Sequence, residues 1–141
     1  MKEFLAVALL KTTAYLPLPV LHGLGVLVGR LVSFSSPKLR RITRKNIEAC
    51  FPYMDETGIK QASRAAFDEL GKVTLEMGWM WGANAHRQKA AVKSVENESL
   101  FKDALDSGKG VLILAPHQGA WEMIGSYLAW HDKPVTSMYR P

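Results

Sequence analysis

Two side chains that together could act as a general base lie five positions apart in the C-terminal part of the chain. His117 follows an apolar run at 111–115, and Glu122 lies in the first turn of the helix predicted next. A neutral imidazole takes a proton from a hydroxyl group, while a neighbouring carboxylate fixes its tautomer and stabilises the imidazolium. The spacing therefore indicates acid–base chemistry. It is equally typical of a structural His at a strand end, followed by a carboxylate at a helix start.

The elements around His117 are expected to place it at the edge of a parallel sheet. Residues 111–115 are continuously aliphatic, as in a strand buried on both faces, and Pro116 ends the run. Residues 121–130 have helical spacing, and a second strand is expected at 135–139. This order predicts an α/β fold, in which ligands bind beyond the carboxyl ends of the strands.

The loop after His117 offers groups for substrate binding. Gly119 lets the backbone turn tightly at this point. The exposed amide groups at the start of the following helix could bind an anionic group.

Three further helices are predicted before this region. Ser36 and Pro37 begin the first, which ends at Phe51 and Pro52. The second covers about 58–82, and the three-to-four spacing of its apolar residues predicts a buried stripe at Ala62, Ala66, Leu70, Val73, Met77 and Met80 or Trp81. Glu76 lies within its apolar end and requires a partner, because a buried carboxylate is costly alone. A short helix follows at 98–106, which Asn97 can cap.

The N-terminal segment is apolar enough to associate with a membrane. No Asp, Glu, Lys or Arg occurs from 12 to 29, which is close to the length of a membrane span, but Pro17 and Pro19 interrupt it. We expect one helix at 3–15 and another at 18–34, lying on or in the membrane interface. A signal peptide is the competing interpretation, although Lys11 and the prolines stand where a cleavage site would be expected.

The positive charge is concentrated beside this apolar segment. Residues 1–50 hold eight Lys and Arg against two Asp and Glu, a net charge of +6, while the whole chain carries +5. Five cations fall within eight residues: Lys38, Arg40, Arg41, Arg44 and Lys45. This cluster predicts contact with an anionic membrane or an acidic carrier protein, and an exposed basic helix face is the plainer alternative. Nucleic acid is not expected, because no aromatic residue lies within 38–45 to stack on bases.

Neither a disulfide framework nor a metal site is expected. Cys50 is the single cysteine, and we interpret it as a small core residue. His22, His86 and His131 lack metal-ligand spacing with one another or with Cys50, so no zinc or other cofactor is predicted.

The residues around His117 resemble a known signature. The stretch 109–122, KGVLILAPHQGAWE, looks like that of the bacterial lipid A biosynthesis acyltransferase family, itself similar to glycerolipid acyltransferases with a His-(four residues)-acid motif. Further matches lie at 44–47, at 50–52, in the helix near Glu76 and at 139–141. The sequence departs from the family pattern at Gln118, where an aromatic residue is usual, and at Ala120, where Asn is usual.

The resemblance implies an O-acyltransferase that moves a fatty acyl chain from an acyl thioester, such as acyl carrier protein, to a hydroxyl of a lipid acceptor; a lipid A precursor is the commonest acceptor in the family, and related enzymes acylate other lipids. His117 would be the general base and Glu122 its orienting partner. Arg140, Gly119 and Gln118 would contact the substrate. The resemblance also implies a glycerolipid-acyltransferase-like sheet domain, no cofactor, and a place at the cytoplasmic face of the bacterial inner membrane.

Family members are about twice as long as this chain, so we interpret the sequence as the N-terminal half of such an enzyme. Residues 1–34 would form membrane-anchoring helices, and 35–141 an incomplete α/β acyltransferase domain. The alternative is a truncated, non-catalytic membrane-associated fragment or interaction module. A hydrolase is disfavoured because no Gly-x-Ser-x-Gly elbow occurs.

Overall fold

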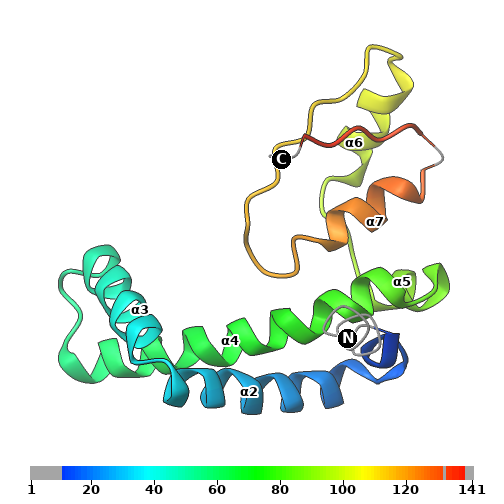
Figure 1. The fold of residues 1–141 in the computed structure, drawn as a ribbon. Coiled ribbons are helices and arrows are strands. Elements are labelled where there is room, and N and C mark those ends of the chain that lie inside the picture. The colour runs from blue at the N-terminus through cyan, green and yellow to red at the C-terminus, as the bar shows by residue number, and fades with distance from the viewer. Residues whose placement is uncertain (1–10, 132, 139–141) are drawn as a thin grey trace. The chain divides into compact units, whose positions relative to one another are not determined.

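The computed structural model describes residues 11–131 and 133–138, and the chain divides into two compact units (Figure 1). Unit 1 comprises the residues up to Gly82, and unit 2 comprises those from Ala83 onward. The predicted helix at 3–15 lies largely outside the described residues, although residues 11–15 are helical.

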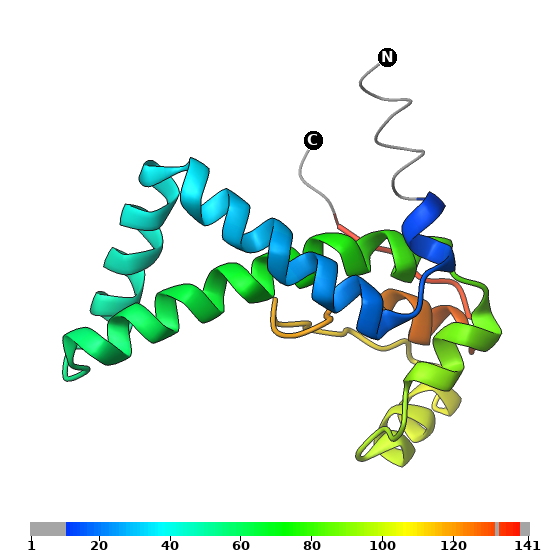
Figure 2. The ribbon, with the colours of Figure 1, turned by 90° about the horizontal axis from the view of Figure 1, so that it is seen from below.

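Besides the helical residues 11–15, the described part of unit 1 contains α2 (Leu18–Ser35), α3 (Pro37–Cys50) and α4 (Glu56–Gly82). The helices α2 and α4 run in opposite directions side by side (Figure 1). In the second view they diverge toward one end, and α3 spans the opening between them (Figure 2). Side chains from all three helices can therefore face a common space inside this open end.

Glycines allow the backbones of α2 and α4 to touch. Gly25, Gly29 and Gly71 are all buried, and a Cβ added to Gly29 would overlap the carbonyl of Phe67. A Cβ on Gly71 would likewise overlap the backbone of Gly25. Residues without a side chain permit close approach of two helices, as in the small-residue interfaces of membrane helices. Only glycine fits these contact positions.

The predicted limits of the unit 1 helices are confirmed. Pro37 is the first residue of α3, and the Ser36 hydroxyl accepts a hydrogen bond from the Leu39 amide at 3.4 Å. The helix α4 begins two residues earlier than predicted, where the Asp55 carboxylate accepts a bond from the Gly58 amide at 2.7 Å. These helix ends follow from local sequence signals.

The buried face of α4 agrees with the predicted stripe at Met80 but differs from it at Leu70. Leu70 is half exposed, whereas the neighbouring Phe67, Gly71 and Leu75 are buried. The prediction followed the large aliphatic residues. The buried face of α4 is instead determined by the contact of Gly71 with α2. Glycine has no side chain, so it does not appear in a sequence pattern of apolar residues. Cys50 is exposed, so its interpretation as a core residue was wrong.

Unit 2 contains α5 (Ala85–Ala91), α6 (Glu98–Asp106) and α7 (Met123–Ala129). Tyr127 of α7 donates a hydrogen bond to Glu98 of α6 at 3.0 Å, and its ring lies 5.8 Å from that of Phe101. Sequence reasoning located α6 and α7 but missed α5. Asn97 occupies the predicted N-cap of α6 with φ 54° but makes no capping side-chain hydrogen bond.

The predicted α/β sheet is contradicted. Within the described residues the regular elements are helices, and neither 111–115 nor 133–138 forms a strand. All five residues at 111–115 are exposed, with Leu112 at 85% and Leu114 at 87%. A strand is defined by hydrogen bonds to a neighbour, and a strand buried on both faces also needs covering layers. Among the described residues, 111–115 have no neighbouring strand and no covering layer, so their aliphatic composition alone does not make them a strand.

Candidate functional site

His117 and Glu122 lie on the loop that leads into α7 in unit 2. The His117 ring packs against Trp121, with 4.3 Å between ring centroids and an angle of 55° between the planes. Glu122 is the residue that precedes the first turn of α7, in helical conformation (φ −58°, ψ −24°). The packing on Trp121 holds the imidazole beside the start of the helix.

A tight turn joins the two residues. The Gln118 amide donates to the Pro116 carbonyl at 2.8 Å, and Gly119 adopts φ +59°. This left-handed conformation is strained for residues with a Cβ, so the structure requires glycine at this position. The turn expected at Gly119 is confirmed.

The two candidate catalytic side chains are near neighbours without being joined. Among the described residues, no hydrogen bond links His117 to Glu122, and the ring contact with Trp121 is the contact found for His117. His117, Gln118 and Gly119 are exposed, while Glu122 is partly buried. Arg140, the third predicted substrate contact, lies outside the described residues. The geometry leaves the His117 imidazole accessible to solvent.

The predicted basic cluster divides into two groups on α3. Arg40 and Arg44 line a cleft in unit 1, whereas Lys38, Arg41 and Lys45 are exposed on α3 and do not line it. The alternative of a single exposed basic helix face therefore does not describe the whole cluster, because two of its five cations line a cleft.

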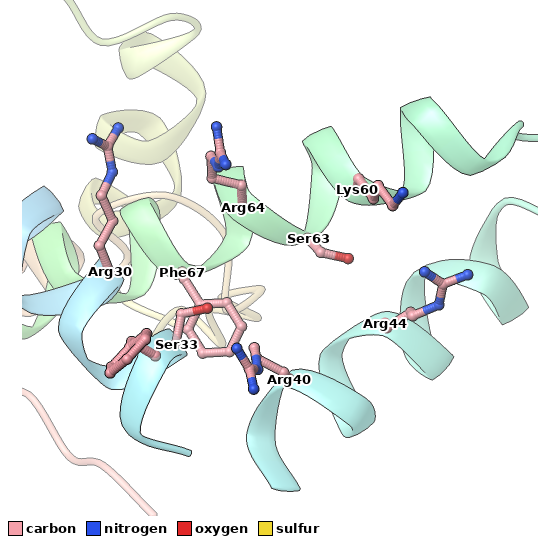
Figure 3. Close-up of a pocket in the computed structure, with 9 residues that line it drawn as sticks. Arg30, Ser33, Arg40, Arg44, Lys60, Ser63, Arg64 and Phe67 are labelled. Atoms are coloured by element: carbon pink, nitrogen blue, oxygen red, sulfur yellow. The ribbon is translucent and has the colours of Figure 1, made fainter. Parts of the chain in front are cut away.

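The cleft lies between α2, α3 and α4 and has a volume of about 610 Å³ (Figure 3). We call it the basic cleft, and it is lined by Arg30, Ser33, Phe34, Arg40, Arg44, Lys60, Ser63, Arg64 and Phe67. Sequence reasoning missed Arg30, Lys60 and Arg64. Single basic residues within predicted helices carry no local signal, and only the packing of three helices brings them together.

Ion pairs fix part of the rim of the basic cleft. The Arg44 guanidinium binds both carboxylate oxygens of Glu56, at 2.8 and 2.5 Å, and Glu48 at 2.7 Å. The hydrogen bonds from Arg44 lower the pKa of Glu56 from 4.5 to about 2. Arg30 makes a second two-pronged pair with Asp68, at 3.1 and 3.2 Å. These forks tie α3 and α2 to α4.

A His–Glu pair joins α2 and α4 away from the cleft. The carboxylate Oε1 of Glu76 is hydrogen-bonded to Nε2 of His22. The Glu76 side chain is 16% exposed and that of His22 is 41% exposed. The partner expected for Glu76 is thus found, and it comes from a helix 54 residues away in sequence.

Neither site has the donor set of a metal centre. Within residues 11–131 and 133–138, no three His, Cys, Asp or Glu side chains gather closely enough to hold a metal ion.

The helix α2 is long and apolar enough to cross a membrane by its length and composition.

Comparison with known proteins connects these features to one family. A family model described as bacterial lipid A biosynthesis acyltransferase matches residues 1–141. The lipid A biosynthesis palmitoleoyltransferase of Escherichia coli (strain K12) is 29% identical over 128 residues, which cover 89% of this chain and 40% of that protein. The lipid A biosynthesis lauroyltransferase of the same organism is 26% identical over 140 residues, covering 98% and 44%.

A lipid A biosynthesis acyltransferase of Haemophilus influenzae is 29% identical over 140 residues, covering 98% of this chain and 44% of that protein. The chain thus spans 40–44% of the length of these relatives. No solved structure matches it significantly. Because the family match extends over all 141 residues, the chain belongs to the bacterial lipid A biosynthesis acyltransferase family.

Proposed function

We propose that this protein is an O-acyltransferase that moves a fatty acyl chain from a thioester to a hydroxyl of a lipid A precursor, with His117 as general base. The observation that carries the proposal is the family match over the whole chain, combined with an accessible His117 at the turn before α7. The names of two relatives, a palmitoleoyltransferase and a lauroyltransferase, describe transfer of a fatty acyl group.

The proposed reaction needs one base and one group to stabilise negative charge. The His117 imidazole accepts the proton of the acceptor hydroxyl while its oxygen attacks the thioester carbonyl carbon. The resulting oxyanion collapses, the C–S bond breaks, and the thiolate takes the proton from the imidazolium. The products are an ester and a free thiol, and no cofactor is consumed. Donors for the oxyanion are the backbone amides near Gly119, with Gln118 and Arg140 as substrate contacts.

Glu122 is proposed to orient His117 and to stabilise the imidazolium. Among the described residues the two are not hydrogen-bonded, and catalytic hydrogen bonds often tighten only when substrate is bound. The alternative is a membrane-associated module without catalytic activity, which the long apolar helix α2 would equally serve. The thioester donor is proposed to be acyl carrier protein, and the site of action the cytoplasmic face of the inner membrane.

The test is acyl transfer from labelled acyl carrier protein to a lipid A precursor. His117→Ala should reduce turnover by roughly 100-fold or more, because general-base catalysis contributes at least that factor. His86→Ala is the matched control, since His86 is an exposed histidine on α5. Equal turnover of the His117→Ala variant and the unmodified protein would remove His117 from the mechanism. No turnover by the unmodified protein would favour the non-catalytic module.

A further inference from the structure

Two cations of the basic cleft have no carboxylate partner in the part of the chain that the structure describes. Arg30 is paired with Asp68, and Arg44 and Lys60 share Glu56. Among the described residues, Arg40 and Arg64 make no ion pair or hydrogen bond through their side chains, although both line the cleft (Figure 3). The cleft therefore keeps a positive charge that the residues at 11–131 and 133–138 do not neutralise.

The polar groups of the cleft suit a phosphate. Guanidinium groups present forked donors that match phosphate oxygens, and the free Arg40 and Arg64 come from different helices, α3 and α4. The Ser63 hydroxyl is buried at the wall of the cleft and has no hydrogen-bond partner among the described residues. Buried polar groups are nearly always satisfied, so a bound oxygen would supply what Ser63 lacks.

A row of apolar side chains on α2 ends at the same cleft. We call it the apolar stripe, and it consists of Val20, Leu24, Leu27, Leu31 and Phe34, which are 44–80% exposed. Their spacing of three and four residues places them on one face of α2, away from the buried Leu21, Gly25 and Gly29. The stripe is about 21 Å long at the rise of an α-helix.

Phe34 belongs to both surfaces. It is 80% exposed at the end of the apolar stripe, and it also lines the basic cleft. A cationic cleft thus continues into an apolar surface, which is the arrangement that an amphiphile with an anionic headgroup requires. We propose that the basic cleft binds the phosphate headgroup of an anionic membrane lipid, while the lipid's acyl chains lie along the apolar stripe of α2.

A lipid fits these observations better than an acidic carrier protein. A carrier protein would neutralise cations on an outer helix face, such as Lys38 and Arg41, but it would leave the apolar stripe uncovered. Only 17% of the 18-residue helix α2 is buried, so most of this helix is not part of the core of unit 1. The cleft also has a size suited to a headgroup, about 610 Å³. This proposal does not depend on catalysis by His117, which belongs to unit 2.

The first test compares two pairs of substitutions that remove equal charge. Arg40→Gln with Arg64→Gln empties the cleft of its free cations, and Lys38→Gln with Arg41→Gln removes two cations outside it. Binding is measured by co-sedimentation with phosphatidylcholine vesicles containing phosphatidate. For the control pair, vesicle affinity should fall by roughly fivefold per cation removed, because each cation near an anionic surface contributes that factor through the surface potential alone. For the cleft pair, vesicle affinity should fall by at least about tenfold more than for the control pair, because the forked hydrogen bonds to phosphate are lost as well.

Folding is checked for both pairs by circular dichroism and thermal melting. None of the four residues makes an ion pair among the described residues, so both pairs should melt like the unmodified protein. Equal losses of vesicle binding in the two pairs would overturn the proposal and leave a diffuse basic surface.

The second test asks whether the phosphate matters. At matched surface charge, vesicles containing phosphatidate should bind more tightly than vesicles containing oleate, whose headgroup is a carboxylate. That preference should disappear in the Arg40→Gln, Arg64→Gln variant. Equal binding to both lipids would overturn the proposal. So would stabilisation by inorganic phosphate without vesicle binding, or loss of acyl carrier protein binding in that variant with vesicle binding unchanged.

The third test concerns the apolar stripe. Leu27→Gln with Leu31→Gln should weaken binding to neutral and anionic vesicles alike, because these side chains would contact the acyl chains rather than the headgroup. Leu100→Gln is the control, since Leu100 is 68% exposed on α6 of unit 2. Unchanged vesicle binding by the Leu27 and Leu31 variant would overturn the placement of the acyl chains.

Discussion

The two units build their candidate sites in opposite ways. In unit 2, His117 and Glu122 come from one short stretch of sequence, and the local turn at Gly119 places them. In unit 1, the basic cleft is lined by single side chains from three helices: glycine contacts join α2 to α4, and the Arg44–Glu56 ion pair joins α3 to α4. A contiguous motif can therefore be found by sequence reasoning before its geometry is known. A site assembled from distant residues appears only once the helices are packed.

The largest expected effect concerns the packing that assembles unit 1. Gly29→Ala should destabilise unit 1 by about 3 kcal/mol, because its Cβ would overlap the backbone of Phe67 and force α2 away from α4. The measurement is denaturant unfolding in detergent micelles. Gly23→Ala is the control, since nothing lies within 4 Å of a Cβ there, and it should be neutral or stabilising. Similar unfolding of the two variants would contradict the close helix contact.

The next effect concerns the local motif of unit 2. Glu122→Gln should lower turnover by roughly 10- to 100-fold while leaving the melting temperature unchanged, because an amide cannot stabilise the imidazolium as a carboxylate does. In a His117→Ala background the same change should add no further loss, since residues acting as one unit are not additive. A full additional loss in that background would show that Glu122 acts independently of His117. Glu96→Gln, on an exposed residue, is the control.

A smaller effect is expected for the pair that joins α2 and α4 away from the cleft. His22→Ala and Glu76→Ala should each cost about 1–2 kcal/mol of stability, because each leaves a partly buried polar group without its partner. In a double-mutant cycle the combined cost should be less than the sum. Strict additivity would mean that the His22–Glu76 hydrogen bond does not contribute.

The smallest effect is the acid sensitivity of the contact between α3 and α4. The pKa of Glu56 is about 2 in the folded protein against 4.5 for a free carboxyl, so its pairing with Arg44 stabilises the fold above pH 4.5. This contribution should be lost as the pH falls from 4.5 to 2. Both side chains are largely exposed, which keeps it small. Unfolding midpoints of the unmodified protein and Glu56→Gln should converge at low pH, and a constant difference would contradict the assignment.

Local signals were reliable for helix ends and weak for the faces that helices bury. Ser36 and Pro37 begin α3 as predicted, because a cap and a proline act within one turn. The buried face of α4 was misjudged at Leu70, because Gly71 sets the contact with α2 and glycine has no apolar side chain to reveal it. The predicted strand at 111–115 was wrong for a related reason, since strand pairing depends on neighbours that a single run does not specify.

The sequence by itself determined the helix limits of unit 1, the glycine turn after His117 and the resemblance that led to the family. Each of these depends on residues a few positions apart, where backbone sterics and capping decide the outcome. Only the tertiary structure decided the basic cleft, the partner of Glu76 and the exposure of residues 111–115. These depend on which distant surfaces meet, and here that is governed by the glycine contacts between α2 and α4 and by the absence of a pairing strand among the described residues.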